Sequence, residues 1–439
     1  MLGPFGLTLL STTNSSDRSQ RMECTMNAKP KVCVAMIGAR MHYAVPRLLH
    51  EAGLLDRFFT DGYIGNKPWL ETALRAVPDV FRLEWFQRWL GRKDAKLPSK
   101  RVTSFDLLGL RIALALRNVR TDADRERIFA ETNGQFAKSV LRHGFGFANT
   151  VWGFNTASLE LFRAAKARGL RCILEQTILP RTLERQLLAQ VGAEWPDWQP
   201  GFHEGIGQGR LAEREKAEWE LADQIVAGSD FVMQGLIQCG VPKEKIHVIP
   251  YGVDQSRFGP TRGNTGGDGP LRVLFVGEVG LRKGAPYLLE ALRRIGRDQV
   301  EARFVGRIAL DPSKLATYSG IAQFVGPVPR TEMPEQYRWA QLFVLPSIVE
   351  GSAVATYEAL MSGLPVVATP NTGTIVTHGQ NGIIVPARDI DALTSAIKMY
   401  CRDRVLLEIN KKFSKENFYK IDVKRYGHDI CKLINIDND

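Results

Sequence analysis

Short apolar runs alternate with amphipathic stretches along most of the chain. The first run is KVCVAMI at Lys31–Ile37, and it ends at Gly38. A nearly continuous apolar run is typical of a strand in a parallel sheet whose two faces are both covered by helices. A helix is expected over Val45–Ala52, and the next strand at Phe58 and Phe59. These elements predict a βαβ opening.

The alternation continues up to a stretch rich in glycine and proline and then begins again. In the first half, strands are expected at Thr150–Trp152, Arg171–Leu174 and Gln224–Val226, with helices such as Ser158–Arg168 and Arg210–Leu221 between them. After the stretch FGPTRGNTGGDGP, strands are expected at Arg272–Val276, Ala302–Val305, Ile321–Val325, Leu342–Leu345 and Pro365–Ala368, and helices at Pro286–Arg294, Glu332–Ala340 and Ser352–Met361. The chain is therefore predicted to fold as two doubly wound α/β sheets of similar size.

These patterns divide the chain into a leader, two domains and a tail. Residues 1–28 are expected to be a disordered leader, 29–257 an N-terminal Rossmann-like domain, 258–270 a linker, 271–400 a C-terminal Rossmann-like domain, and 401–439 a helical tail that packs back on the N-terminal domain. No window approaches the roughly 18 to 20 apolar residues that a membrane-spanning helix needs.

Composition and charge narrow the class of protein only slightly. Of the 439 residues, 44% are hydrophobic and 24% are charged, as in an ordinary globular protein. The net charge of +11 suits nucleic acid, anionic lipid or a phosphate-bearing small molecule equally well. The six cysteines form no CxxC pair, which argues against a zinc knuckle and a disulfide framework and favours a reducing, cytoplasmic location.

Candidate chemistry concentrates in PSIVEGSAVATYEALMSGLPVVATPNTG at Pro346–Gly373. Glu350 stands in the loop after a predicted strand, and Glu358 follows eight residues later inside a predicted helix. Ser352 lies near the start of that helix, where unpaired N–H groups and the helix dipole favour phosphate. Glu350 could then accept hydrogen bonds from a sugar and Glu358 from a ribose on either side of a diphosphate. Two glutamates at this spacing are common in proteins, so the spacing alone does not indicate a site. In the alternative interpretation, Glu350 caps a loop and Glu358 is solvated or satisfies a local amide.

The surrounding residues resemble a known signature. The pattern PSxxEGxxxxxxEAxxxGxPVVA is similar to the Glu-x7-Glu motif of the retaining glycosyltransferases called family 4, also known as glycosyl transferases group 1. The matching residues are Pro346, Ser347, Glu350, Gly351, Glu358, Ala359, Gly363, Pro365, Val366 and Val367.

Two upstream segments extend this resemblance. LFVGEVGLRKGAPYLLEAL at 274–292 is similar to the family's loop in which a basic residue before a glycine holds the donor diphosphate, and Lys283 occupies that place. ADQIVAGSDFV at 222–232, followed by KIHVIPYGVD, resembles the family's link between its two domains. The resemblance covers roughly 31–396 and is strong after Glu218.

The resemblance implies the GT-B fold, in which two Rossmann-like domains face each other across a cleft, with the acceptor on the N-terminal domain and the nucleotide-sugar on the C-terminal domain. It implies a retaining hexosyltransferase that moves a sugar from a nucleotide-diphosphate donor to a hydroxyl of a glycan or lipid-linked acceptor, in bacterial polysaccharide, lipopolysaccharide or glycolipid synthesis. The implied catalytic residues are Glu350, Lys283 and Asn155. The implied donor-binding residues are Arg282, Lys283, Gly351, Ser352, Ala353, Val354, Glu358 and Val328, the last for the base.

The sequence departs from the family pattern in two places. Glu278 stands where many members carry arginine, which removes an expected cation from the diphosphate site, and Arg282 either replaces that cation or is a solvated loop residue. In VWGFNTAS, Asn155 is the nearest polar counterpart of a histidine that the family often places near the reacting sugar. Asparagine cannot titrate, but it can position a sugar while the leaving phosphate accepts the acceptor's proton.

The loop after the first strand is a further candidate contact with donor or acceptor. It follows the carboxyl end of a strand, where ligands of doubly wound folds bind, and it holds Gly38, Arg40 and His42. The family's double glycine is missing from this loop, and His42 has either a functional or a structural role.

No metal and no cofactor are expected, since the nucleotide sugar is a substrate. Metal-dependent transferases hold a divalent ion with an Asp-x-Asp pair at the end of a strand. The two such pairs here, Asp122 with Asp124 and Asp389 with Asp391, stand at predicted helix starts, where acidic residues favour the helix dipole.

Peripheral contact with an anionic membrane is a further expectation, whereas nucleic acid is not an expected partner. The stretch Arg82–Arg120 mixes Trp, Phe and Leu with many Arg and Lys residues. Such a stretch can lie on anionic lipid, although core helices with extended basic side chains look the same. Two other classes stay open: a non-catalytic sugar-nucleotide binding protein and a nucleotide-sugar epimerase of the same fold.

Overall fold

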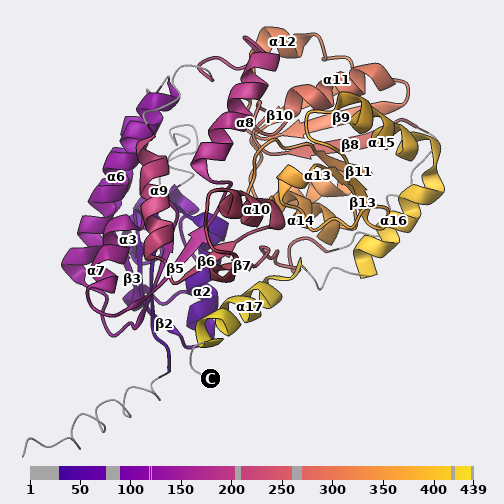
Figure 1. Ribbon diagram of the computed structural model, residues 1–439. Helices are drawn as coiled ribbons and strands as arrows, with labels where there is room; N and C mark the ends of the chain where they lie inside the picture. The colour runs from indigo at the N-terminus through magenta and orange to yellow at the C-terminus, as the bar shows by residue number, and fades with distance from the viewer. Residues whose placement is uncertain are drawn as a thin grey trace, which may run out of the picture.

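The protein is described by a computed structural model that covers residues 29–75, 89–117, 119, 121–202, 209–259, 269–416 and 421–436. Two parallel sheets lie side by side, each with helices on both faces (Figure 1). The predicted leader at 1–28 and most of the predicted linker at 258–270 lie outside the described residues. The two-domain Rossmann-like fold expected from the sequence is confirmed.

The first sheet has seven strands in the order β3-β2-β1-β4-β5-β6-β7, and all of its pairs are parallel. The strand order reverses between β1 and β4, which places a topological switch point between the loops that follow these two strands. The strands are β1 Val32–Met36, β2 Leu55–Thr60, β3 Val102–Ser104, β4 Thr150–Phe154, β5 Arg171–Gln176, β6 Gln224–Ala227 and β7 Ile246–Val248.

Helices cover both faces of this sheet because its strands carry apolar side chains on both sides. One face packs against α5, α6, α7 and α10, and the opposite face packs against α2 and the C-terminal helix α17. The α-helices of this domain are α2 Ala44–Glu51, α3 Pro68–Arg75, α5 Asp106–Arg117, α6 Asp122–His143, α7 Leu159–Lys166, α8 Arg181–Glu194, α9 Arg210–Leu221 and α10 Asp230–Gln238.

The second sheet has six parallel strands in the order β10-β9-β8-β11-β12-β13, so its switch point lies between β8 and β11. The strands are β8 Leu271–Val276, β9 Val300–Val305, β10 Ala322–Gly326, β11 Leu342–Leu345, β12 Val366–Ala368 and β13 Gly382–Ile384. The helices after β8 are α11 Ala285–Ile295, α12 Pro312–Ala316, α13 Met333–Trp339, α14 Val354–Met361, α15 Ile390–Arg402, α16 Arg404–Glu416 and α17 Val423–Asn435.

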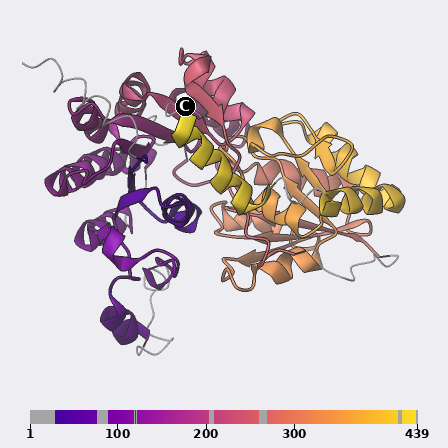
Figure 2. The same cartoon turned by 90° about the horizontal axis from the view of Figure 1, so that it is seen from below.

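The last helix, α17, returns to the first domain and lies against α2 (Figures 1 and 2). Ile430 and Leu433 of α17 are buried in the same apolar cluster as Leu48 of α2. Arg171, at the start of β5, donates from Nη1 to Ile434 O (2.8 Å) and from Nη2 to Leu433 O (3.0 Å). These bonds satisfy carbonyl groups at the end of the helix, where a cation is also favoured by the dipole.

The chain crosses between the domains twice, and the two crossings run side by side. Val253 N donates to Ile421 O (2.8 Å), and Val423 N donates to Val253 O (3.1 Å). Nearby, the Tyr251 hydroxyl donates to the buried Glu175 carboxylate at the end of β5 (2.9 Å). The segment before the second domain and the segment before α17 are therefore joined by backbone hydrogen bonds at one place.

The strands and helices that were predicted by residue range match the structure to within a few residues. Helices α8 and α10 had no predicted range, and several short elements were missed as well. β3 and β13 have three residues each, and α12 has five, which is too short for a periodic pattern to be recognised. Both Asp-x-Asp pairs stand at helix starts, as predicted, one at the start of α6 and the other at the start of α15. The Asp389 side chain accepts a hydrogen bond from Ala392 N (2.8 Å) at the start of α15.

Candidate functional site

The carboxyl ends of the two sheets face each other, and the loops at the two switch points lie at this junction. Loops after β5 and β6 of the first domain contact the loop after β11 of the second domain. In open α/β sheets, ligands bind at such switch points. The predicted site residues of both domains belong to these loops or to neighbouring ones.

Glu350 is the centre of a partly buried ion cluster in the loop after β11. Lys283 Nζ lies 2.6 Å from Glu350 Oε1, and the Arg282 guanidinium donates to the same carboxylate and to Val349 O (3.1 Å). Burial on its own would raise the pKa of Glu350, but the adjacent Lys283 and Arg282 hold it below the ordinary value. Two cations and one carboxylate leave this cluster with a net positive charge.

Glycine at position 284 allows the loop after β8 to close against the loop after β11. Gly284 has φ +71°, and a Cβ atom there would lie 2.0 Å from Pro346 O. Ile348 N also donates to Arg282 O (2.9 Å). The backbone therefore brings the adjacent Arg282 and Lys283 to Glu350, as the resemblance implied that basic residues would approach this loop.

Helix α14 begins at Val354 directly behind the Glu350 loop. Its N-cap residue, Ala353, offers no side-chain cap, so no side chain competes for the N–H groups of the first turn. The Ser352 hydroxyl instead shares a 2.7 Å hydrogen bond with the Tyr357 hydroxyl, and Ser352 is only 6% exposed. A phosphate contact from Ser352 would therefore come from its main chain.

Glu358 lies on α14 about one turn after the helix begins and is half-buried. The Tyr337 hydroxyl of α13 donates to its Oε2 (2.7 Å). Burial raises the pKa of Glu358, and Tyr337, Arg330 and Arg257 act in the opposite direction. Arg330 belongs to the loop after β10, as does Val328, which packs against the apolar core. Glu358 and the predicted base-binding loop therefore belong to one side of the site.

The loop after β1 has an unusual backbone. Met41, His42 and Tyr43 are three successive non-glycine residues in the left-handed region, with φ of 44°, 51° and 61°. Each such residue costs on the order of 1 kcal/mol, and such conformations cluster at functional sites. Gly38 N donates to Asp61 Oδ1 (2.7 Å) at the start of the loop, and Tyr43 is fully buried at its end.

Arg40 and His42 project from this strained loop. Arg40 Nη1 donates to Thr177 Oγ1 (2.8 Å), and its guanidinium lies over the Phe154 ring. His42 is exposed, yet the surrounding protein partly excludes water from its ring, which disfavours the charged form. The guanidinium groups of Arg330, Arg257 and Arg47 also repel a positive charge there. Both effects lower the pKa of His42, to about 4, so that its imidazole is neutral at pH 7.

Asn155 follows β4 and is held inside the first domain. It is 2% exposed, its Nδ2 donates to Glu215 Oε1 (3.0 Å), and its Oδ1 accepts from Thr177 N (3.2 Å) and Thr177 Oγ1 (2.8 Å). Thr177 in turn accepts from Arg40. The Asn155 amide therefore acts on the junction through Thr177 and Arg40, and a direct contact of Asn155 with a sugar stays a prediction.

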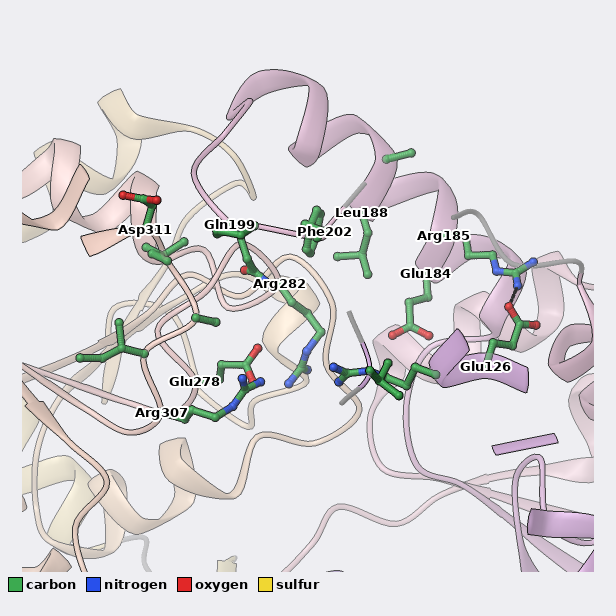
Figure 3. A pocket seen from close by; sticks show the side chains of 18 of the residues that line it. Glu126, Glu184, Arg185, Leu188, Gln199, Phe202, Glu278, Arg282, Arg307 and Asp311 are labelled. Atoms are coloured by element: carbon green, nitrogen blue, oxygen red, sulfur yellow. Dashed lines mark hydrogen bonds and ion pairs between the residues drawn. The ribbon is translucent and has the colours of Figure 1, made fainter. Parts of the chain in front are cut away.

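Glu278, the residue that departs from the family pattern, pairs with Arg307 from the loop after β9. Arg282 points instead to Glu350, while it also lines a pocket together with Glu278 and Arg307 (Figure 3). Arg307 therefore lies beside the switch point of the second sheet with its charge paired to Glu278, outside the Glu350 cluster.

Several residues of this junction were missed by sequence reasoning. Thr177 follows a predicted strand, so the rule that ligands bind at the carboxyl ends of parallel strands could have identified it. Tyr337, Arg330 and Arg307 carry no recognisable signal, because they reach the site from segments outside the motifs. Within the described residues, no group of three or more His, Cys, Asp or Glu side chains could hold a metal ion, and the expectation that no metal is needed stays a prediction.

Comparison with known proteins finds a family model that matches the second domain. Residues 270–403 match the model of the family described as glycosyl transferases group 1. The structure is similar to that of sucrose-phosphate synthase from Thermosynechococcus elongatus, with a TM-score of 0.67 and 19% identity over 92% of this chain and 98% of that one. It is also similar to Anabaena HepE in complex with UDP-glucose, with a TM-score of 0.60 and 16% identity over 93% and 100% of the two chains.

This chain spans about half the length of the curated relatives that it matches in sequence. The D-inositol 3-phosphate glycosyltransferase of Geodermatophilus obscurus is 32% identical over 211 residues, which cover 42% of this chain and 47% of that protein. The amylovoran biosynthesis glycosyltransferase AmsK of Erwinia amylovora is 30% identical over 177 residues, which cover 37% and 43%. The second domain is therefore similar to group 1 glycosyltransferases, and the whole chain shares the GT-B fold of the structural neighbours.

The contact at Gly351 generates the first testable prediction. Ser229 Oγ donates to Gly351 O (2.5 Å), and a Cβ atom at Gly351 would lie 1.9 Å from the backbone oxygen of Thr177. We expect Gly351→Ala to lower the free energy of unfolding by about 1 to 3 kcal/mol, because a backbone atom of the other domain must move to admit the methyl group. Urea unfolding of the purified protein measures this change.

Gly320→Ala is the matched control for this substitution, since a Cβ atom at Gly320 meets nothing within 4 Å. The control should change the unfolding free energy by less than about 0.5 kcal/mol. Equal stability of the Gly351→Ala variant and the control would show that the two domains do not meet at Gly351 in solution.

Proposed function

We propose that this chain is a retaining glycosyltransferase that moves a hexose from a nucleotide-diphosphate donor to a hydroxyl of a glycan or lipid-linked acceptor. The observation that carries the proposal is the convergence of Lys283 and Arg282 on Glu350 beside the start of α14, with Glu358 on the same helix. This arrangement offers positive charge for a diphosphate between two carboxylates that can bind hydroxyl groups.

The proposed chemistry uses the cluster to stabilise the leaving group. The diphosphate lies against Lys283, Arg282 and the main-chain N–H groups of Gly351, Ser352 and Val354, which face the charge that develops as the bond to the sugar breaks. The N–H of Ala353, a predicted donor-binding residue, instead donates to Thr372 O (3.2 Å). Glu350 binds sugar hydroxyls, Glu358 binds ribose hydroxyls, and the base lies near Val328. The net positive charge of the Glu350 cluster favours this anion before any reaction begins.

For retention, the acceptor hydroxyl attacks from the face that the diphosphate leaves. The bond from the anomeric carbon to the acceptor oxygen forms as the bond to the phosphate oxygen breaks, and the acceptor's proton passes to the leaving phosphate. No titrating group of the protein is required for this proton. Arg40, which Thr177 and Asn155 hold in place, and His42 reach the junction from the first domain and are assigned to positioning the sugar or the acceptor.

The comparisons support this proposal without identifying the substrates. A structural neighbour, Anabaena HepE, is seen with UDP-glucose, and two sequence relatives are named as a D-inositol 3-phosphate glycosyltransferase and an amylovoran biosynthesis glycosyltransferase. A thermal-shift screen of UDP-, GDP- and ADP-sugars would identify the donor, since a ligand at about 100 times its dissociation constant adds about 2.7 kcal/mol to stability.

Lys283→Ala tests the role assigned to the cluster. Loss of this charge-assisted contact should cost roughly 2 to 4 kcal/mol in the transition state, and turnover should fall by about a hundredfold or more. Lys412→Ala, which removes an exposed lysine of α16, is the control and should leave turnover unchanged. Turnover within threefold of wild type in the Lys283→Ala variant would contradict the assignment.

The same assay separates the remaining classes. Transfer or hydrolysis of the donor supports a transferase, interconversion of two nucleotide sugars without an acceptor supports an epimerase, and binding without any turnover supports a sugar-nucleotide binding protein. Anomeric analysis of the product reports retention or inversion.

Metal independence has its own test. In this proposal Lys283, Arg282 and helix dipoles take the role that a divalent ion has in other transferases. Activity of the wild-type protein should therefore persist in EDTA at concentrations that strip Mg²⁺ and Mn²⁺. Complete loss of activity in EDTA, restored by either ion, would refute this part of the proposal.

We also propose that helix α5 contacts an anionic membrane surface. Leu107, Leu110 and Leu114 lie on one face of α5 and are 80%, 37% and 57% exposed, whereas Leu108 and Ile112 on the other face are buried. Arg111 and Arg117 are also exposed on this helix, so apolar and basic groups share its outer surface. Such a surface suits the boundary of anionic lipid. Among the described residues, no helix is both long and apolar enough to span a bilayer.

Vesicle flotation tests the α5 surface. The protein should float with vesicles that contain phosphatidylglycerol at low salt and less at high salt, and a Leu107→Ser/Leu114→Ser variant should float several-fold less. A Val405→Ser/Ile409→Ser variant, which changes two exposed residues of α16, is the matched control and should float like wild type. Absence of flotation at both salt concentrations would end the membrane proposal.

A further inference from the structure

A large pocket opens between the two domains beside the Glu350 cluster. Its volume is about 830 Å³, toward the upper end of the roughly 300 to 1,000 Å³ of small-molecule sites. We call it the α8 pocket, since Arg181, Glu184, Arg185, Leu188 and Ala189 of α8 form one wall. The start of α6 continues this wall, and the loops after β8 and β9 form the opposite one (Figure 3).

The α8 pocket adjoins the proposed site of reaction through Arg282. The Arg282 side chain lines the pocket, and its guanidinium bonds to Glu350. Glu278 and Arg307 lie next to it on the same wall (Figure 3). A molecule bound in the pocket would therefore have one end at the sugar side of the donor site.

The charges that line the α8 pocket are paired within the protein. On the first-domain wall, Arg185 pairs with Glu126, and Arg181 Nη1 donates to Glu184 Oε2 (2.8 Å). On the second-domain wall, the pairs are Arg307 with Glu278 and Arg282 with Glu350. Arg185, Arg181 and Arg307 thus each have a carboxylate partner, and Arg125 and Asp311 add one charge of each sign to the lining. Only the Arg282 end carries the positive charge of the Glu350 cluster. Most of the pocket therefore offers donors and acceptors together without the excess of positive charge that an anion would require.

Aromatic rings complete the lining. Phe129 of α6 and Phe202 face the pocket together with Leu188 of α8. Paired donors and acceptors beside apolar rings match the surface of a sugar, which has hydroxyl groups at its edge and C–H groups on its faces. Glu278 fits this composition, since its carboxylate can accept hydrogen bonds from hydroxyl groups.

The two walls of the pocket are fixed to each other. Leu281 N of the second domain donates to Gln199 Oε1 (2.9 Å), and Asp311 N donates to Trp198 O (2.8 Å). Trp195 and Trp198 also pack against each other, and Trp195 packs against the Tyr287 ring of α11. The segment after α8 therefore ties the first-domain wall to the loops of the second domain, so the pocket is built by contacts on both sides.

From these observations we propose that the α8 pocket binds the acceptor, and that this acceptor is a neutral oligosaccharide of at least two sugar rings. The inference rests on the proposed transferase function and deepens it by naming the class of acceptor. The hydroxyl that reacts lies at the Arg282 end of the pocket, and the preceding sugars extend between α8 and the loop after β9.

Binding measurements with defined probes test this inference. Maltose to maltotetraose and the matching cello-oligosaccharides serve as neutral probes, and oligogalacturonides serve as acidic probes. The binding of each probe is observed by saturation-transfer NMR in the presence of the nucleotide that the thermal-shift screen identifies. Neutral probes should bind more tightly as they lengthen from one to three sugars. Arg307→Ala and Phe129→Ala should each weaken this binding at least fivefold and leave the nucleotide affinity within twofold of wild type.

Arg297→Ala, an exposed arginine of the second domain outside the pocket, is the control and should alter neither affinity. Arg307→Gln replaces the alanine variant if the latter lowers the melting temperature. Once an acceptor is found in the transfer assay, these pocket variants should raise its KM and leave the KM of the donor unchanged.

Three results would each overturn the inference. The first is tight, salt-sensitive binding of the acidic probes in preference to the neutral ones, and the second is loss of nucleotide affinity in the pocket variants, which would assign the pocket to the donor. The third is a protein that binds nucleotide but none of the neutral probes. Failure of the proposed function is distinguishable from all three, because it would appear as the absence of any thermal shift with nucleotide sugars.

Discussion

The contact of Gly351 with the first domain is the constraint on which the rest of the site depends. At this position the loop after β11 touches the loop after β5 so closely that a Cβ atom would lie 1.9 Å from Thr177 O. Gly373 shares the constraint, since a Cβ atom there would lie 2.2 Å from Gly351 O. Because Glu350 directly precedes this contact and Ser352 follows it, the position of the carboxylate relative to the first domain is set by backbone packing.

Thr177 extends this contact into the first domain. Its hydroxyl donates to Asn155 and accepts from Arg40, and its main-chain N–H also donates to Asn155. Asn155 is in turn held by Glu215, whose carboxylate also accepts from Gln176 Nε2 (2.7 Å). A buried network in which the members satisfy one another has little freedom to shift, so Arg40 is presented to the junction from a rigid base.

The ion cluster around Glu350 has a different physical character. Removing charges from water is costly, and a buried pair offsets that cost only with good geometry, so a lone lysine at the position of Lys283 would lose much of its charge. Glu350 counteracts this loss, and the second cation, Arg282, leaves the cluster positive. Burial lowers the pKa of Lys283, and the carboxylate that is proposed to bind the sugar acts in the opposite direction, favouring the charged form of both cations.

How much of the fold and of the candidate site could be predicted from the sequence depended on how far apart the interacting residues lie along the chain. The two sheets followed from local hydrophobic patterns, and Glu350, Glu358 and Lys283 followed from contiguous motifs. The bond between Asn155 and Glu215 joins residues 60 positions apart, and the pairing of Glu278 with Arg307 joins different loops. No periodicity or spacing reports such contacts, because they depend on how the loops at the sheet ends approach one another.

The two crossings between the domains restrict how the junction can open. The segments near Val253 and Ile421 are bonded to each other, and α17 is anchored on the first domain through Arg171. A change in the angle between the domains must therefore turn about these paired segments, which lie at one end of the junction. The Gly351 contact involves main-chain atoms and one serine hydroxyl, so it can separate without exposing a large apolar surface. The geometry thus combines a pivot at these paired segments with a main-chain contact at Gly351. The bonds and rings that tie the segment after α8 to the second domain must also separate or turn with it before the junction can open, so this segment sets the larger part of the cost of opening.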